Sequence, residues 1–147
     1  MGIKPILIAR LLTGLCLITL FFSGCAPKQT AALSKTETRS SELGSSAQVA
    51  VVPFFPQLDY QCGPATLAMA MNAAGVKVSS ASLRKQLFIP GKQGSLQVEM
   101  QALPRRFGLL AYRLKPQLTD ILKEIKAGHA VIVLQNLGLS VSPQWHY

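Results

Sequence analysis

The chain of 147 residues has little cysteine and no long apolar run, and only one of its residues is tryptophan. Its three cysteines are Cys16, Cys25 and Cys62, and the first two lie within the first 25 residues, so we expect no disulfide within the folded domain. Two histidines and the remaining cysteine do not show the spacing of metal ligands. The sequence therefore excludes a disulfide scaffold and predicts neither a metal nor another cofactor.

Acidic residues are also scarce. The chain has six Asp and Glu and fifteen Lys and Arg, which gives a net charge of +9. This balance favours anionic partners such as lipid headgroups. The basic residues are scattered and form no known nucleic-acid motif, so we expect no binding of nucleic acid. The N-terminal apolar stretch, LLTGLCLITLFF, has 12 residues and is too short for a comfortable membrane span.

The first 25 residues indicate a secretory signal, because Lys4 and Arg10 accompany the apolar stretch and SGC follows it. The segment FSGC resembles a bacterial lipobox, which implies cleavage before Cys25 and diacylation of that residue. An uncleaved signal anchor with an incidental cysteine is the alternative. Ala26 resembles the outer-membrane sorting pattern. We therefore expect a lipoprotein of the bacterial cell envelope, anchored in the outer membrane through Cys25, facing the periplasm and carrying a net charge of +7 without its signal.

Two regions follow the signal. Residues 26–48 are rich in Ser, Thr, Ala and Gln, lack aromatic and β-branched aliphatic residues, and predict a flexible tether. Residues 49–147 show the patterns of one folded domain. Helices are expected early in this domain and strands later, which predicts an α+β fold with the first helices packed on an antiparallel sheet.

The expected elements of the domain follow from helical periodicity, short apolar runs and the positions of proline and glycine. Early helices are predicted at 64–74, ended by Gly75; at 82–88, capped by Ser80 or Ser82; and at 96–107, opened by Ser95 and kinked or shortened by Pro104. A later helix is predicted at 119–127, capped by Thr119 and ended by Gly128, between strands at 109–114 and 129–135.

The segment DYQCGPATLAMAM, residues 59–71, places Cys62 at the start of the first helix. A helix N-terminus has unpaired N–H groups and a partial positive charge, which favour the thiolate, the nucleophilic form of cysteine. Gly63 has no side chain and is expected to leave room for a substrate beside the sulfur. A small buried cysteine that fills a gap is the alternative interpretation.

The segments PQLDYQCGPATLAM, GHAVIVLQ and WHY together resemble the bacteriocin-processing cysteine peptidases, the double-glycine leader peptidases of the papain-like superfamily. The resemblance covers residues 50–147 and implies a papain-like fold and a peptide substrate, with cleavage after Gly-Gly by analogy with the family. It makes Cys62 the nucleophile, His146 the general base and Gln57 the side-chain donor to the oxyanion. Gln61 is a rival for that donor.

Several alternatives stay open. His129 is expected to be a partly exposed structural histidine, and it is the second candidate for the base. In the superfamily an Asp or Asn follows the catalytic histidine, whereas this sequence stops at Tyr147, so we expect that residue and the last strands to be missing. An NlpC-type cell-wall peptidase is a second functional class, although its Asp-Cys-Ser-Gly setting differs from QCGP. A non-catalytic peptide-binding module is a third, and the oligomeric state is not indicated.

Overall fold

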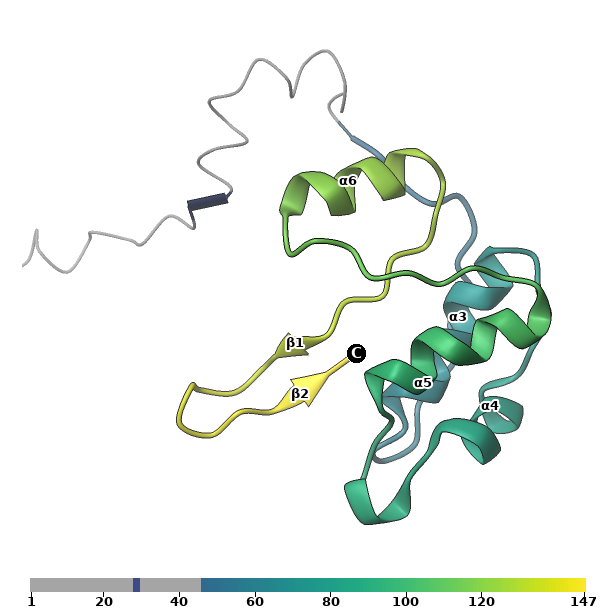
Figure 1. Cartoon of the computed structure of the whole chain (residues 1–147), viewed down its shortest axis with the longest axis vertical. Helices are drawn as coiled ribbons and strands as arrows, with labels where there is room; N and C mark the ends of the chain where they lie inside the picture. The colour runs from purple at the N-terminus through teal and green to yellow at the C-terminus, as the bar shows by residue number, and fades with distance from the viewer. Residues whose placement is uncertain (1–27, 30–45) are drawn as a thin grey trace, which may run out of the picture. The chain divides into compact units, whose positions relative to one another are not determined.

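The computed structural model describes residues 28–29 and 46–147 (Figure 1). The predicted signal with Cys25 and most of the predicted tether lie outside these described residues. The chain divides into two units, Met1–Thr36 and Glu37–Tyr147, and the second contains the folded domain. Within the described residues no helix combines the length and the apolar character needed to cross a bilayer.

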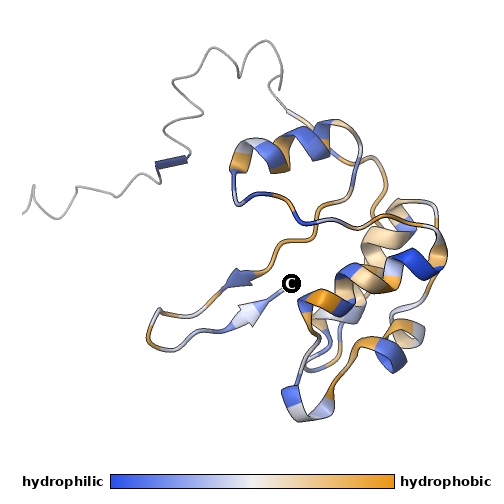
Figure 2. Cartoon of the chain, in the orientation of Figure 1, coloured by the Kyte–Doolittle hydropathy of each residue, from blue (hydrophilic) through white to orange (hydrophobic). Residues whose placement is uncertain are grey.

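The first helix of the domain, α3, spans Cys62–Ala73 and begins before the predicted start at Pro64. Pro64 lies in its first turn, where the missing N–H removes no intrahelical hydrogen bond. Gly75 leaves the helix with a φ of 86°, the left-handed exit that the sequence predicts. The helix carries no charged residue, and Figure 2 shows it in the pale orange of apolar residues over most of its length.

The second helix, α4, spans Ser80–Leu87 and is capped by Ser79. The Ser82 backbone N–H donates a hydrogen bond to Ser79 Oγ (3.2 Å), and Ser82 Oγ donates one to the Ser79 carbonyl oxygen (2.8 Å). Ser82 donates both bonds, and the first of them satisfies an N–H that the first helical turn leaves without a partner. The prediction of Ser80 or Ser82 as the cap was therefore wrong, since both lie inside the helix.

The predicted third helix is divided into α5, Gln97–Ala102, and a 3₁₀ helix, η3, Leu103–Phe107. Pro104 causes the change because it has no N–H to donate to the carbonyl four residues earlier, so the expected shortening is confirmed. The expected cap was wrong. Leu96 is the N-cap and makes no side-chain hydrogen bond, while Ser95 lies against the start of α3.

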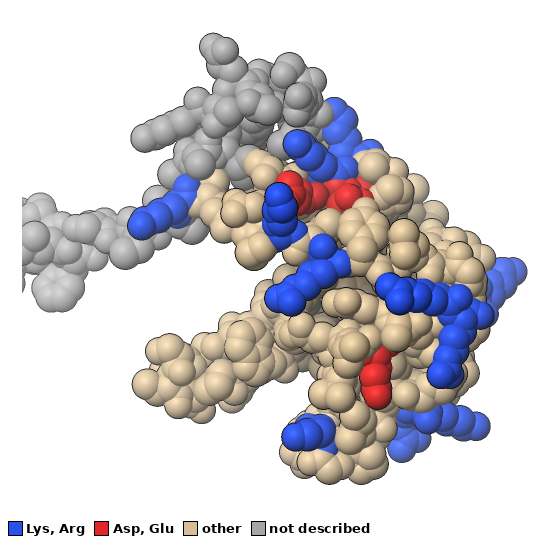
Figure 3. Space-filling model, viewed as in Figure 1, with Lys and Arg blue, Asp and Glu red and all other residues tan. Residues whose placement is uncertain are grey.

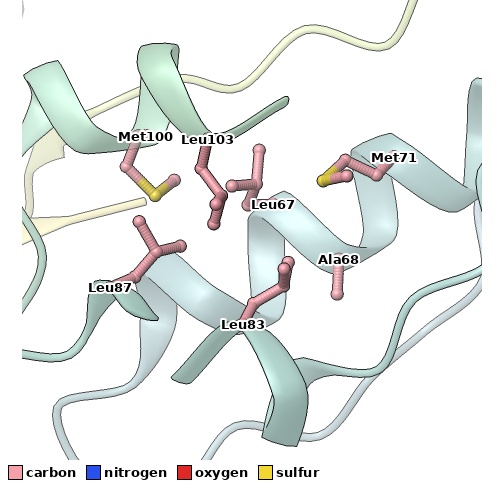
Figure 4. Close-up of a cluster of buried hydrophobic side chains, with 7 residues drawn as sticks. All are labelled: Leu67, Ala68, Met71, Leu83, Leu87, Met100 and Leu103. Carbon is pink, nitrogen blue, oxygen red and sulfur yellow. The ribbon is translucent and has the colours of Figure 1, made fainter. Parts of the chain in front are cut away.

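The buried core is formed by helix against helix, and Figure 4 shows its side chains converging from α3, α4, α5 and η3. The cluster comprises Leu67, Ala68, Met71, Leu83, Leu87, Met100 and Leu103. The strands supply none of these residues within the described chain, so the core itself is formed by helices and not by the first helix on a sheet. Helices together with an antiparallel sheet remain consistent with the predicted α+β class.

The strands are much shorter than predicted. Only β1, Gln135–Asn136, and β2, Trp145–His146, pair as a two-stranded antiparallel sheet among the described residues. Residues 109–114 and 129–134 are described but belong to no strand, so those two predictions were wrong over these residues. Both segments are largely apolar, and residues 129–134 also contain the β-branched Val131, Ile132 and Val133, a composition that favours a strand. A strand forms only where a neighbour completes its backbone hydrogen bonds.

The last helix, α6, spans Leu118–Lys126, and Gly128 ends it with a φ of 85°, as predicted. Its N-cap is Gln117, which makes no side-chain cap bond, so the prediction of Thr119 as the cap was wrong. None of the residues of α6 is fully buried, and the helix therefore lies outside the core. A single 3₁₀ turn, η2 (Pro90–Lys92), connects α4 to α5.

Candidate functional site

Cys62 is the first residue of α3, and it is half-buried with a free thiol. The chain enters the helix through a turn in which Tyr60 has a left-handed φ of 61° and the Gln61 N–H donates to the Leu58 carbonyl oxygen (3.0 Å). The Gln61 carbonyl oxygen then accepts a hydrogen bond from the Ala65 N–H (3.2 Å). These bonds fix the backbone on both sides of the sulfur.

The surroundings of Cys62 suit a nucleophile. The first N–H groups of a helix have no acceptor within it, and together they carry a partial positive charge. The first turn of α3 contains no acidic residue that would offset this charge. Cys62 is also not one of the residues of the buried core, which argues against a cysteine that only fills a gap.

Gly63 lies against Ser95 and does not open a path to the sulfur. A Cβ atom added to Gly63 would lie 2.7 Å from both Cβ and Oγ of Ser95, closer than nonbonded atoms normally approach. The expectation that this glycine leaves room for a substrate was therefore wrong. The Ser95 Oγ is buried and has no hydrogen-bond partner within the described chain, so this hydroxyl contributes only packing to the contact between Gly63 and Ser95.

The C-terminal end of the described chain lies against α3. Thr66 Oγ1 donates a hydrogen bond to the backbone oxygen of Tyr147 (3.4 Å), and Tyr147 packs on the core. Thr66 follows Cys62 by one helical turn, so both residues lie on the same side of the helix. His146 is half-buried and pairs with Gln135 across the two strands. The fold thus brings the strand with His146 to the helix with Cys62.

The phenol of Tyr147 provides a second sign that the two segments meet at the sulfur. Burial raises the pKa of Tyr147 above its usual value, and the negative charge of a Cys62 thiolate raises it further. The second cause requires proximity, because solvent and salt screen charges that lie far apart. Neither Tyr147 nor Thr66 was predicted from the sequence to belong to the site. The spacing of one helical turn from Cys62 is the signal that points to Thr66.

The two glutamines considered as oxyanion donors differ in exposure. Gln57 is exposed in the extended segment that precedes α3. Gln61 is half-buried and is the N-cap of α3, but its side chain makes no cap hydrogen bond. The choice of Gln57 over Gln61 stays a prediction.

His129 belongs to a cluster of its own. Its Nδ1 lies 2.7 Å from Glu124 Oε2, and the Tyr112 hydroxyl also donates a hydrogen bond to Glu124. The bonds from His129 and Tyr112 lower the pKa of Glu124, and the bond to Glu124 raises the pKa of Tyr112. Asp120 lies in the first turn of α6, where an acid complements the helix dipole. This cluster fits the structural interpretation of His129.

The geometry combines a half-buried thiol at a helix N-terminus with a histidine-bearing strand held against the same helix, which are features of a thiol-dependent hydrolase. In the part of the chain that the structure describes, no three His, Cys, Asp or Glu side chains gather as possible metal ligands. A family model described as Peptidase_C39 like family matches residues 49–147, and the chain belongs to this family. The family suggests cysteine peptidase activity. No curated protein and no solved structure matches the chain.

Proposed function

We propose that the chain is a cysteine peptidase with a papain-like fold, in which Cys62 is the nucleophile and His146 the general base. The hydrogen bond from Thr66 to Tyr147 is the main support, because it joins the strand with His146 to the helix that begins at Cys62. Membership in the peptidase family supports the reaction class.

In the proposed reaction His146 takes the proton of the Cys62 thiol, and the sulfur attacks the carbonyl carbon of a peptide bond. The backbone N–H of Cys62 and the side-chain amide of Gln57 donate hydrogen bonds to the oxyanion, and loss of one such donor typically costs about 3 kcal/mol of transition-state stabilisation. The C–N bond breaks as His146 gives its proton to the leaving amine. Water, deprotonated by His146, then hydrolyses the thioester and restores the thiol.

Hydrolysis of two substrate classes tests this proposal. The full chain is incubated with a peptide that contains a Gly-Gly leader site and, separately, with muropeptides, and the products are identified by mass spectrometry. We expect cleavage after Gly-Gly, and we expect Cys62→Ala to lower the rate by a factor of about 1,000 or more. Cleavage of muropeptides alone would favour the NlpC-type alternative. Binding of the peptide without any cleavage would favour a non-catalytic module.

The proposed enzyme is a lipoprotein, with Cys25 acylated in the outer membrane, residues 26–48 as the tether and the domain in the periplasm. The support lies in the sequence, namely the FSGC segment and the composition of the tether. Metabolic labelling with a radioactive fatty acid should mark the wild-type protein and not Cys25→Ala, while both hydrolyse a soluble peptide at the same rate. Equal labelling of the two proteins would contradict the anchor.

A further inference from the structure

The segment from residue 135 to residue 146, which we name the C-terminal hairpin, exposes apolar side chains outside the core. Val141 is 88% exposed and Trp145 is 63% exposed, and Leu137 and Leu139 are also exposed. Isolated apolar residues are common on protein surfaces, but several neighbouring ones mark an interaction site.

Hydrogen bonds within the C-terminal hairpin give it a defined shape. Asn136 Oδ1 accepts hydrogen bonds from the backbone N–H groups of Gly138 (3.0 Å) and Gln144 (2.7 Å). The Ser142 N–H donates to the Leu139 carbonyl oxygen (3.0 Å) in an antiparallel bridge. Backbone groups that are bonded to each other lose less free energy on leaving water than unpaired groups. The hairpin tip is therefore suited to a partly apolar environment.

The charge around the C-terminal hairpin favours an anionic surface. Residues 127–147 contain no Lys, Arg, Asp or Glu. Residues 46–147 contain ten Lys and Arg, all of them exposed, and four Asp and Glu. Figure 3 shows the hairpin as an uncharged tan projection, with Lys and Arg side chains on the surface to either side of it. An apolar tip beside a basic surface matches the acyl boundary and the phosphates of an anionic bilayer.

We propose that the C-terminal hairpin docks on an anionic lipid bilayer, with Leu139, Val141 and Trp145 in the interfacial region and basic side chains of the domain near the lipid phosphates. Tryptophan favours this interface because its ring is amphipathic. Since Trp145 precedes His146, docking holds the candidate site at the bilayer surface, a consequence that rests on the proposed function.

Fluorescence of Trp145 tests the docking directly, because this is the only tryptophan in the chain. The full chain with Cys25→Ala, which removes the proposed acylation site, is mixed with vesicles of phosphatidylglycerol and phosphatidylcholine. We expect the emission to shift to shorter wavelength and to be quenched by brominated lipids, and we expect a weaker response with phosphatidylcholine alone. Unchanged emission from vesicle-bound protein would overturn the proposal.

Two identical substitutions form a matched pair on this background. Val141→Asp adds a charge at the hairpin tip, whereas Val98→Asp adds the same charge on α5, where Val98 is 66% exposed. Val141→Asp should lower vesicle partitioning about tenfold or more, and Val98→Asp should lower it much less. Both proteins retain the N-terminal apolar stretch, so that stretch does not account for a difference. Equal losses would overturn the proposal.

The emission of Trp145 also distinguishes the bilayer from other binding partners of the C-terminal hairpin. A shift that grows with protein concentration in the absence of vesicles would assign the surface to a second copy of the chain. A shift that requires a leader peptide would assign it to the substrate, and either result overturns bilayer docking. Cys62→Ala should bind vesicles normally while it loses peptide hydrolysis, so failure of the docking proposal is distinct from failure of the proposed function.

Discussion

The segment from Ala65 to Leu103 and the segment from residue 109 to residue 147 differ in how they are stabilised. All eight buried hydrophobic residues of the described chain lie in the first segment. In the second segment, apolar residues such as Leu110 are exposed, and others contact the core without being fully buried. The candidate nucleophile Cys62 begins the helix of the first segment, and the candidate base His146 lies in the second. Stability and chemistry therefore depend on different residues.

The largest expected effect on stability comes from truncating matched leucines in the two segments. Leu83 is fully buried between helices, whereas Leu110 is 75% exposed. Leu83→Ala should lower the free energy of unfolding by about 2–5 kcal/mol, because it removes buried contacts and leaves a cavity. Leu110→Ala should change it by about 0.5 kcal/mol or less. Urea denaturation measures both, and equal losses would contradict the difference between the segments.

The contact between Gly63 and Ser95 is the next most sensitive feature. Gly63→Ala should lower the free energy of unfolding by about 1–3 kcal/mol, because the new Cβ would overlap the Ser95 side chain. Adding Ser95→Gly to this variant removes both overlapping atoms and should recover most of the loss, as measured by urea denaturation. If the double variant is no more stable than Gly63→Ala alone, steric overlap is not the cause.

Thr66 tests the connection between the two segments. Thr66→Val keeps the shape of the side chain but removes the hydrogen bond to Tyr147, so the free energy of unfolding should fall by about 1 kcal/mol. Alkylation of Cys62 by iodoacetamide should slow several-fold, because the strand with His146 is released. Thr66→Ser keeps the hydroxyl and should retain the wild-type rate. Slowing of equal size in both variants would point to a packing effect unrelated to the hydrogen bond.

The smallest effect is expected at Glu124. Its pKa is lowered in the folded state, chiefly by the hydrogen bond with His129, so its carboxylate stabilises the fold above the unfolded pKa and loses this contribution as the pH falls through the folded pKa. Glu124→Gln should lower Tm by about 1–2 °C near neutral pH. The difference should shrink as the pH falls below the unfolded pKa of glutamate, about 4.3, and vanish below the lower folded pKa, as followed by thermal unfolding across pH. A difference that persists in acid would exclude the carboxylate as its source.

The sequence predicted best those features that one residue determines locally. Gly75 and Gly128 end their helices because glycine adopts a positive φ without strain, and Pro104 interrupts its helix because it has no N–H. The caps were predicted poorly, because several serines lie near the start of α4, and because Leu96 and Gln117, the N-caps of α5 and α6, make no side-chain cap bond that a sequence pattern would reveal. Ser82 donates two hydrogen bonds to Ser79, and nothing in the spacing alone distinguishes that pair from its neighbours.

Features that depend on distant partners could not be predicted. The run 129–135 has the composition of a strand, but only its last residue pairs with another segment. The place of Cys62 at a helix start follows from the local sequence. The bond between Thr66 and Tyr147 joins residues 81 positions apart, and periodicity contains no information about such pairs.

The most direct test of the account is the pH dependence of Cys62 alkylation in the wild-type chain and in His146→Ala. Mass spectrometry assigns the label to Cys62 and separates it from Cys16 and Cys25. If Cys62 and His146 act as a pair, the wild-type thiol reacts rapidly below neutral pH, and His146→Ala reacts there as slowly as a free thiol. Identical pH profiles for the two proteins would contradict the pairing on which the proposed peptidase depends.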